Sequence, residues 1–476
     1  MILNEHQLKI SRQRLKELRQ AFLQLKEKYP KPEDFEFYSL GVREHIEQIE
    51  KDIKNFESKK SKTDTLHSEL AMSLSVEEQF KVIKRGTAEI IPEDELIQKF
   101  EKSQRERRPL RVKLGIDPTA PDIHLGFAVV LRKLRQFQDL GHEVALIVGD
   151  FTATIGDPSG KSKTRPMLSQ KEVRENAKTY VEQLYKILDE DKTRVFYNGD
   201  WLSKMSFADV IQLASKYTVA RVLERDDFSN RLSQQQPLYM HEILYPLCQG
   251  YDSVAIKSDI EMGGTDQKFN NLVGRDLQRE YGQEPQVVIA MPILVGTDGV
   301  EKMSKSLGNY IGITEPPNEM YGKVMSIPDE PMIDYFKLAT DVSMSEIEEI
   351  ERGLRDETLH PKEVKQRLAR EIVTIYHNEK AAQAAEEEFT RVFHDRELPQ
   401  DIPDVNVPSS LFKDGKIWIV RLLTHVNFAQ SNREARTLVE QGAVILNDEK
   451  ITEPIDLPLE NGSILKVGRR FARLVV

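Results

Sequence analysis

The spacing of apolar residues changes twice over residues 111–141. Apolar and polar side chains alternate over residues 111–116, which predicts a β-strand. Two prolines within residues 117–122 predict a loop. From His124 the apolar residues recur at helix-like intervals until Gly141, which predicts a helix. A helix N-terminus placed after a strand and a tight loop can hold phosphate, because its first N–H groups are unpaired and lie at the positive end of the helix dipole.

A glycine in the predicted helix and a second stretch of the chain support a phosphate-binding or nucleotide-binding site. Gly126, in the first helical turn, has no side chain, so a flat ligand could lie against the backbone there. Strand–loop–helix units occur in every α/β protein, however, so this feature alone does not identify a nucleotide site. Residues 302–306 read Lys-Met-Ser-Lys-Ser and precede a leucine and a glycine. Two lysines around small hydroxyl residues are typical of a mobile loop that closes on a polyphosphate, and the alternative is a solvated turn.

The neighbouring segments predict a parallel sheet. Residues 143–148 form a short apolar run typical of a buried parallel strand, and residues 287–294 predict the last strand before the lysine pair. A strand, a helix and a strand in succession indicate a right-handed crossover, with ligands at the carboxyl ends of the strands. Asp157 follows such an end, although beside proline and glycine it is equally a turn former. Residues 75–319 are therefore predicted to be an α/β, Rossmann-like parallel-sheet domain.

A second group of polar residues indicates a small-molecule pocket. Tyr245, Gln249 and Asp252 stand at i, i+4 and i+7, on one face of a predicted helix whose other residues are largely apolar. Polar groups buried in a row need partners, and a small zwitterionic ligand is one solution; an exposed polar surface is the alternative. Residues 253–260 resemble a strand, and residues 262–267 follow with two glycines and a carboxylate, which suits close approach to a ribose.

The flanking segments differ from this body. Residues 1–74 carry two narrow apolar stripes of coiled-coil type, which predict an N-terminal helical hairpin with a packing role. Residues 320–397 are helical and highly charged, and residues 398–411, with three prolines, predict a linker. Residues 412–476 contain ten Lys and Arg against eight Asp and Glu, with two short helices and strands around turns. This α+β segment is a candidate RNA-binding domain, and the alternative is a dimerisation or capping domain.

The amino-acid composition further narrows the classes of protein to which this chain can belong. The 476-residue chain has a net charge of −10, so the whole is not an indiscriminate nucleic-acid binder. Cys248 is the only cysteine, which excludes intramolecular disulfides and multi-cysteine metal sites. The N-terminus is charged from residue 5, with no apolar signal core, and no apolar run approaches the length of a membrane span. A cytoplasmic protein without a metal site of its own is the resulting expectation.

Together the paired stretches resemble the two signatures of class I aminoacyl-tRNA synthetases, His-Ile-Gly-His and Lys-Met-Ser-Lys-Ser. The second is matched throughout, whereas the first ends in Phe127 instead of histidine. From about residue 75 to the end, the chain resembles the bacterial tyrosyl-tRNA synthetases. Its C-terminal segment resembles the S-four RNA-binding domain at Ser431, Arg433, Ala435, Arg436, Gly442, Val444 and Asn447.

This resemblance implies a role for each site residue. Tyrosine would be bound by Asp157, Tyr245, Gln249, Asp252 and Gln267. ATP would be bound by Gly115, Asp117, Gly126, Lys161, Gly264, Asp266, Val295 and Ser304. Catalysis at the phosphates would use Thr119, His124, Lys302 and Lys305. Phosphates of tRNA would be contacted by Arg433, Arg436, Arg469, Arg470 and Arg473. Many relatives carry a tyrosine as second partner of the substrate phenol, whereas this chain has Lys113.

The resemblance also implies the reaction. Tyrosine would be activated by ATP, with Mg²⁺ on the phosphates, and transferred to the 3′ end of tRNA(Tyr) by a homodimer. One alternative keeps the fold and changes the substrate to tryptophan. Another is a synthetase-derived RNA-binding protein without catalysis, which predicts eroded lysine and pocket motifs.

Overall fold

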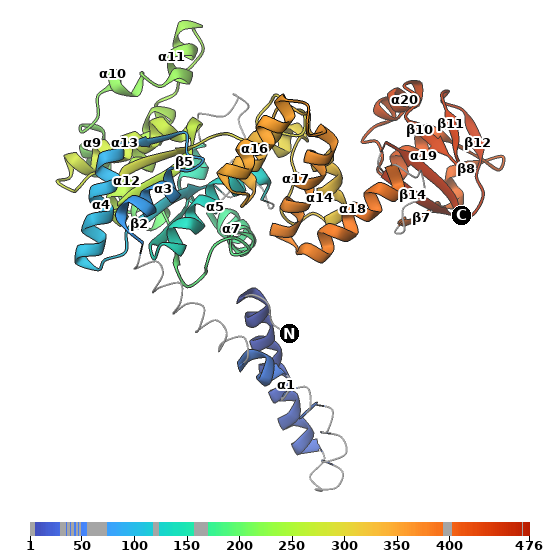
Figure 1. The fold of residues 1–476 in the computed structure, drawn as a ribbon, viewed down its shortest axis with the longest axis horizontal. Coiled ribbons are helices and arrows are strands. Elements are labelled where there is room, and N and C mark those ends of the chain that lie inside the picture. The colour runs from blue at the N-terminus through green and yellow to red at the C-terminus, as the bar shows by residue number, and fades with distance from the viewer. Residues whose placement is uncertain are drawn as a thin grey trace. The chain divides into compact units, whose positions relative to one another are not determined.

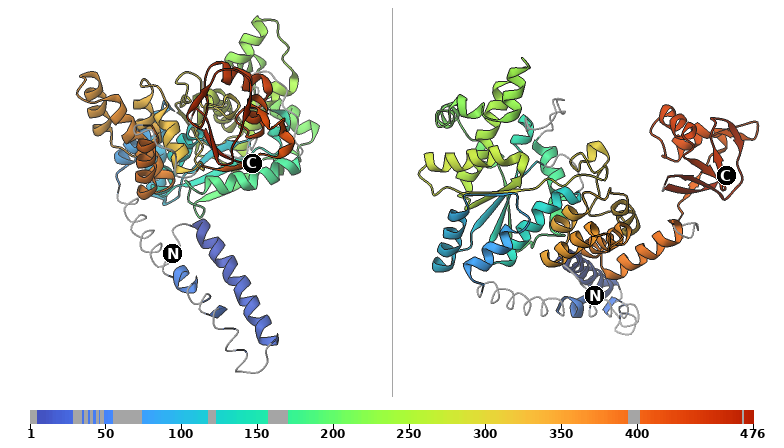
Figure 2. Two further views of the ribbon diagram at one scale, coloured as in Figure 1. Left: turned by 90° about the vertical axis from the view of Figure 1, so that its right-hand side faces the viewer. Right: turned by 45° about the horizontal axis from the view of Figure 1, so that its top comes forward.

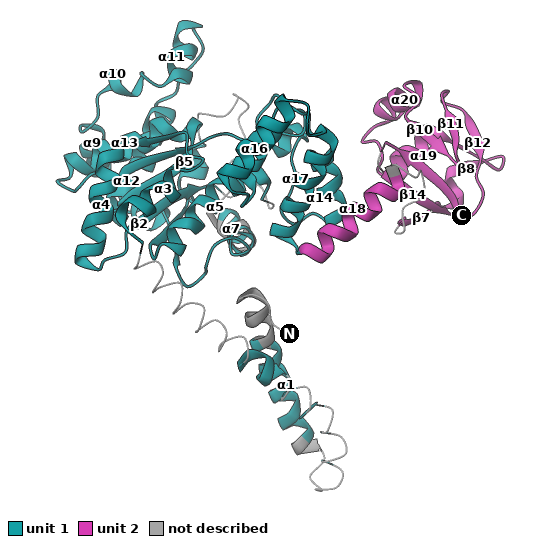
Figure 3. Ribbon diagram, in the orientation of Figure 1, with its two compact units in different colours: residues 1–378 teal, residues 379–476 magenta. Residues whose placement is uncertain are grey.

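The computed structural model describes residues 5–28, 35, 39, 42–43, 46, 49–54, 74–117, 123–156, 170–393, 402–468 and 470–476. The chain divides into two compact units, residues 1–378 and residues 379–476 (Figure 3). Each unit is described separately below. Within the described residues, every helix is too short or too polar to cross a membrane.

A six-stranded sheet forms the centre of the first unit (Figure 1). Its order is β1-β6-β5-β2-β3-β4, and every neighbouring pair is parallel except β1 with β6. The strands are β1 (Glu89–Ile91), β2 (Arg111–Ile116), β3 (Glu143–Val148), β4 (Thr193–Tyr197), β5 (Ile260–Gly264) and β6 (Val287–Met291). The chain runs outward from β2 through β3 to β4 and then returns to β5 on the other side. This reversal beside β2 is the topological switch point, where ligands of open α/β sheets bind.

Helices cover both faces of this sheet (Figure 2). One face carries α3 (Val76–Lys84), α4 (Glu93–Glu106) and α5 (Leu125–Asp139), and the other carries α12 (Met240–Ile256) and α13 (Lys268–Glu280). The remaining helices between the strands are α6 (Thr152–Ile155), α7 (Gln170–Leu184), α8 (Gly199–Leu202), α9 (Phe207–Ala214), α10 (Val219–Val222) and α11 (Asp226–Ser233). Burial on both faces explains the continuous apolar run of β3, in which five of the six residues are buried.

The strand and helix predictions around the switch point are confirmed. The structure places β2, α5 and β3 where the hydrophobic period indicated. The strand predicted over residues 253–260 is wrong. Residues 253–256 are the last turn of α12, which ends at Lys257 in the left-handed conformation, and β5 begins only at Ile260. The apolar side chains there pack a buried helix, and a short apolar run does not distinguish a buried helix from a strand.

A helical segment completes the first unit. It comprises α14 (Pro317–Met325), α15 (Met332–Ala339), α16 (Met344–Arg355) and α17 (Pro361–Tyr376). Ser343 and Glu346 form a reciprocal capping box that fixes the start of α16. At the N-terminus of the chain, α1 (Glu5–Lys28) is one of the two predicted helices. Arg19 lies 2.7 Å from Glu50 in the described helical turn of residues 49–54. The rest of the second predicted helix lies outside the described residues.

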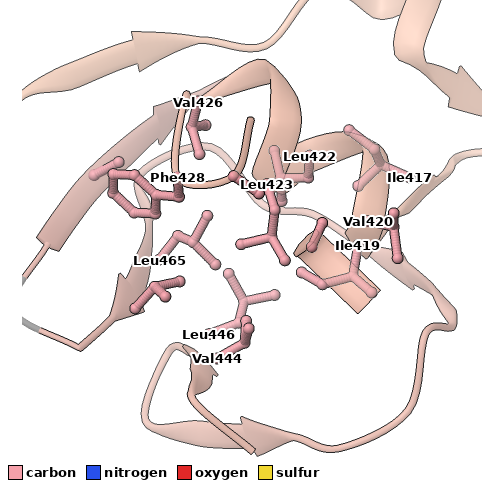
Figure 4. Packing of buried hydrophobic residues seen from close by; sticks show 14 of the residues in the cluster. Ile417, Ile419, Val420, Leu422, Leu423, Val426, Phe428, Val444, Leu446 and Leu465 are labelled. Carbon is pink, nitrogen blue, oxygen red and sulfur yellow. The ribbon is translucent and has the colours of Figure 1, made fainter. Parts of the chain in front are cut away.

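The second unit begins with α18 (Glu379–Phe393) and contains two small sheets, ordered β11-β10-β13-β14-β7 and β12-β9-β8. Helices α19 (Ile419–His425) and α20 (Asn432–Glu440) confirm the two predicted short helices. Leu422, Leu423 and Phe428 pack on Leu465 of the larger sheet in a continuous apolar core (Figure 4). The strands are β7 (Asp404–Asn406), β8 (Phe412–Lys413), β9 (Lys416–Trp418), β10 (Val444–Leu446), β11 (Glu449–Ile451), β12 (Asp456–Pro458), β13 (Ser463–Val467) and β14 (Arg470–Val475).

Part of the predicted linker belongs to this fold. Residues 404–406 form β7, which pairs in parallel with β14 at the sheet edge, and η3 (Ser409–Leu411) follows. Two of the prolines that suggested a linker, Pro403 and Pro408, flank the strand, and a short edge strand tolerates prolines at its ends.

Candidate active site

The carboxyl end of β2 contacts helix α12. Gly115 is exposed near the end of the strand and Asp117 follows it. Asp117 Oδ2 accepts a hydrogen bond of 3.2 Å from the Tyr245 hydroxyl, and its Oδ1 accepts one of 3.4 Å from Thr152 Oγ1. A Cβ at Gly149 would lie 2.1 Å from Asp117 Oδ1, so this close approach requires a glycine. One predicted ATP-binding residue and one predicted tyrosine-binding residue therefore touch.

His124 caps the N-terminus of α5. Its Nδ1 accepts a hydrogen bond of 3.3 Å from the Phe127 N–H, so the ring proton of the neutral imidazole lies on Nε2. Burial and, to a lesser extent, the nearby Lys305 and Lys302 lower the pKa of His124 to about 4. At neutral pH His124 is therefore a neutral N–H donor near two lysines. Phe127, which replaces the second signature histidine, packs against Tyr180 of α7 with ring centroids 5.9 Å apart.

The lysine loop contacts the same helix N-terminus. The Gly126 N–H donates to Met303 Sδ over 3.2 Å, and backbone bridges join Val295 to Lys302 and His124 to Gly312. A Cβ at Gly126 would lie 3.2 Å from Met303 Cβ. The space beside Gly126, predicted from sequence for a ligand, is thus occupied by Met303 and the His124 ring. The structure brings the two signature stretches together.

Asn309 fixes the lysine loop, and the sequence interpretation missed it. Its Oδ1 accepts from the Ser304 N–H at 2.8 Å. Its Nδ2 donates to Asp298 Oδ2 at 2.6 Å and to the Lys302 carbonyl at 3.2 Å. The side chain is only 5 % exposed, so it is a buried tie between the Asp298 turn and the loop. Ser304 Oγ lies 2.9 Å from Ser306 Oγ.

Lys302 also reaches the predicted ribose site. Gly264 ends β5, and Asp266 follows in the single turn η1 (Thr265–Gln267). Lys302 Nζ lies 3.2 Å from Asp266 Oδ2, in a pair that is exposed to solvent. Lys305 begins the turn η2 (Lys305–Leu307). The lysine loop therefore contacts both the helix N-terminus and the end of β5.

The predicted tyrosine-binding residues of α12 share a buried face. Asn270 Nδ2 donates to Gln249 Oε1 at 3.0 Å and to Gln267 Oε1 at 3.1 Å. Arg225 Nη1 in turn donates to Asn270 Oδ1 at 3.1 Å. Asn270 therefore holds the amides of Gln249 and Gln267 in one arrangement. It is a second supporting residue that lacks any local sequence signal.

Among the predicted pocket carboxylates that the structure describes, Asp252 is the most deeply buried, with 3 % of its surface exposed. Trp201 Nε1 donates to its Oδ1 at 2.8 Å, and Asn198 Nδ2 donates to its Oδ2 at 3.2 Å. Burial raises the pKa of Asp252 to about 7, against the opposing effects of Lys113 and these two donors. Asn198 and Trp201 were not predicted, although an Asn-Gly pair directly after a strand marks a turn at the carboxyl edge.

Some predicted site residues have other contacts or are not described. Thr119, Asp157, Lys161 and Arg469 lie outside the described residues. In the second unit, Arg433 and Arg436 are exposed on α20, with Arg436 5.2 Å from the centroid of the Trp418 ring. Arg470 donates to the Phe428 carbonyl at 2.7 Å, and Arg473 pairs with Asp404 of β7 at 3.3 Å. These last two arginines therefore also hold the fold together.

A mostly parallel sheet with its switch point beside a helix N-terminus and a lysine loop is an arrangement that suits nucleotide binding. Residues 104–394 match the family model of class I tRNA synthetases (W and Y), and residues 397–463 match the tyrosine–tRNA ligase SYY-like C-terminal domain. The chain is thus a class I aminoacyl-tRNA synthetase.

Relatives define the family more narrowly. The tyrosine–tRNA ligase of Carboxydothermus hydrogenoformans is 56% identical over 400 residues, covering 83% of this chain and 97% of the relative. That of Thermotoga maritima is 54% identical over 399 residues, covering 83% and 97%. The chain belongs to the tyrosine–tRNA ligase family, as the sequence resemblance predicted.

Solved structures support the fold. A tyrosyl-tRNA synthetase of Archaeoglobus fulgidus complexed with L-tyrosine superposes with a TM-score of 0.52 at 23% identity, covering 66% of this chain and 100% of that one. A C-terminally truncated mitochondrial tyrosyl-tRNA synthetase of Aspergillus nidulans superposes with a TM-score of 0.54 at 20% identity, covering 70% and 100%. The predicted fold class is confirmed.

Asn309→Ala tests whether this buried amide fixes the lysine loop. The substitution removes the acceptor of the Ser304 N–H, and we expect faster hydrogen exchange at that amide and a loss of about 1–3 kcal/mol of unfolding free energy. Ser306→Ala, which leaves every Asn309 bond in place, is the matched control. Hydrogen exchange read by mass spectrometry on the loop peptide distinguishes them. An unchanged rate in Asn309→Ala would show that the loop is held by other contacts.

Proposed function

We propose that this site activates L-tyrosine with ATP, forming tyrosyl-adenylate and pyrophosphate, and then transfers the tyrosyl group to the 3′ end of tRNA(Tyr). The observation that carries the proposal is the convergence of three elements at one edge of the sheet. The N-terminus of α5 contacts the lysine loop through Gly126 and Met303, and the α12 pocket contacts the end of β2 through Tyr245 and Asp117.

In this proposal the α12 pocket takes tyrosine. Asp252 accepts a hydrogen bond from the phenol, since each of its oxygens retains a free acceptor site beside its Trp201 or Asn198 donor. Asp157, Tyr245 and Gln249 bind the α-ammonium group, and Gln267 lies near the carboxylate. The shared tie of Gln249 and Gln267 to Asn270 supports this grouping, because it fixes both amides before the ligand arrives.

The adenosine of ATP is assigned to the neighbouring strand ends. Gly115, Asp117, Gly264 and Val295 surround it, and Asp266 accepts from a ribose hydroxyl. The Lys302–Asp266 pair supports this assignment, because it is exposed and therefore weak enough to yield to the incoming nucleotide.

The phosphates are assigned to the helix N-terminus and the lysine loop. The tyrosine carboxylate is already a nucleophile, so the protein needs no general base; it must position the reactants and balance charge on the departing pyrophosphate. His124 supplies a neutral Nε2–H, Ser304 and Gly126 shape the site, and Lys302 and Lys305 supply positive charge. Thr119 and Lys161 complete the set, and Mg²⁺ accompanies the ATP phosphates as part of the substrate.

Two observations favour this function over its alternatives. A buried acceptor at Asp252 suits a phenol, and the relatives at 52–56% identity are tyrosine ligases rather than tryptophan ligases. A non-catalytic RNA-binding protein would need no contact between Met303 and Gly126.

We assign the tRNA-contacting roles to residues 320–397 and 412–476, joined by residues 398–411, and treat residues 1–74 as an extension. A cytoplasmic homodimer is part of the proposal. Its support is the exposure of five large apolar side chains between residues 207 and 240, each 55–80 % exposed: Phe207, Ile211, Val219, Tyr239 and Met240. Large apolar side chains that are this exposed are candidates for burial in a protein contact.

The direct test is amino-acid-dependent exchange of pyrophosphate into ATP. Tyrosine should support exchange in the purified protein, whereas tryptophan and phenylalanine should support far less. The reason is that a site built around a buried acceptor leaves that acceptor unpaired with phenylalanine. Exchange with tryptophan but not tyrosine would show that tryptophan is the substrate. Exchange with neither amino acid would refute the proposed activity.

Arg433→Ala combined with Arg436→Ala tests the tRNA surface. Both arginines are exposed, so their loss should leave tyrosine-dependent exchange near normal, lower tRNA charging, and flatten the salt dependence of tRNA binding by roughly 0.7–0.9 per lost phosphate contact. The matched control is Arg105→Ala, which removes an exposed arginine of α4, outside the segments assigned to tRNA, and should leave the salt slope unchanged. An unchanged salt slope in the double variant would remove α20 from the tRNA interface.

A further inference from the structure

Lys113 is a buried cation without a role in the site as described so far. It stands in the middle of β2, is 0 % exposed, and faces Glu261, its register neighbour on β5, which is 1 % exposed. Lys113 Nζ lies 2.9 Å from Glu261 Oε1. Withdrawing two charges from water is costly, and replacing such a pair by apolar residues is often neutral or stabilising. Stability alone therefore does not account for it.

The pair supports one turn of α12. Lys113 Nζ also donates to the Gln249 carbonyl at 2.9 Å and to Ser253 Oγ at 2.8 Å. Ser253 Oγ in turn donates to Glu261 Oε2 at 3.0 Å. An ammonium group has three N–H donors, and the structure provides a partner for each. Lys113 is therefore committed to the turn that carries Gln249 and Asp252, and it has no donor left for a ligand.

We propose that Lys113, clamped by Glu261, is a positioning residue that favours the carboxylate form of Asp252 and so makes the pocket select a phenol. The inference rests on the proposed function, because it requires Asp252 to receive the substrate hydroxyl. An ionised Asp252 is a pure acceptor and needs a donor in the ligand, which tyrosine has and phenylalanine lacks. A protonated Asp252 is uncharged, so leaving it without a ligand donor beside an apolar ring costs less than leaving a carboxylate unpaired.

The surroundings of Asp252 support this role. Burial pushes its pKa upward, Lys113 is the largest influence in the opposite direction, and Glu261 opposes Lys113. Cys248, one turn earlier on α12, is a further titratable group near Asp252, and burial keeps it as a thiol by raising its pKa. Trp201 and Asn198, from the far side, do not titrate. The charge state of Asp252 near neutral pH thus depends on the balance between Lys113 and Glu261.

Three variants test the balance: Lys113→Met, Glu261→Gln, and the two combined. The measurement is the pH dependence of kcat/KM for tyrosine in the exchange reaction. This dependence reports the pKa values of ionising groups in the free enzyme. At acid pH, kcat/KM should fall as Asp252 becomes protonated, and this fall is the acid limb of the profile. Lys113→Met should move the acid limb to higher pH by about one unit, so that kcat/KM at a pH on the limb is roughly tenfold lower than in the unaltered protein. Glu261→Gln should move it downward. The double variant should move it upward by less than Lys113→Met, because both charges are gone.

A selectivity readout and a matched control accompany the profile. At neutral pH, Lys113→Met should lower the tyrosine-to-phenylalanine ratio of kcat/KM, whereas Glu261→Gln should preserve it. Lys133→Met is the control: Lys133 is also buried, at 4 % exposure, but its Nζ donates to the Val82 and Arg85 carbonyls and to Gln136. Its removal should leave the acid limb in place.

The outcomes separate the inference from the function on which it rests. Absence of tyrosine-dependent exchange in the unaltered protein would refute the proposed function. Normal exchange, with both single variants losing activity equally at every pH, would show that the pair is only structural. If Lys113→Met does not fold, the double variant and Glu261→Gln still give opposite shifts under the proposal, and shifts of the same sign would overturn it.

Discussion

A carboxylate buried away from water has to be stabilised by the groups around it. The buried Asp252 therefore requires this fold to bring donors and charges to one place. The strand end after β4 supplies Asn198 and Trp201 as donors, and the sheet beneath supplies Lys113 with Glu261. These groups come from distant parts of the chain, so only the complete parallel sheet assembles the pocket. The arrangement gives the site a buried acceptor whose charge is set by its neighbours.

The second constraint is the approach of two stretches far apart in sequence. Strand β6 returns the chain to the carboxyl edge, where Met303 accepts from the Gly126 N–H and Lys302 bridges to Val295. Asn309 then holds the loop through the Ser304 amide. The lysine loop therefore lies beside the N-terminus of α5, whose first three N–H groups are paired with Ile311, Met303 and His124. In the proposed function, the lysine charges act there together with the dipole of this helix.

Local patterns predicted the elements that depend on local forces. The alternation of β2, the helical period of α5, and the i, i+4, i+7 spacing of the α12 residues all appear in the structure. Residues 253–256 were assigned wrongly, because a buried helix end and a buried strand share the same apolar composition. Strand β7 was missed because its pairing with β14 is a long-range contact.

Supporting residues were the least predictable part of the site. Asn198, Trp201, Asn270 and Asn309 act through partners that the fold brings together, so no spacing in the sequence reveals their roles, and the Asn198-Gly199 pair marks only a turn. Arg470 and Arg473, expected at phosphates, also have intramolecular partners that sequence could not reveal.

The central claim is that the buried Asp252 acceptor gives the site its preference for tyrosine. Asp252→Ala, assayed by pyrophosphate exchange with tyrosine and with phenylalanine, tests it most directly. The account predicts that kcat/KM for tyrosine falls while that for phenylalanine does not, so their ratio drops at least about tenfold. A ratio equal to that of the unaltered protein would contradict the account.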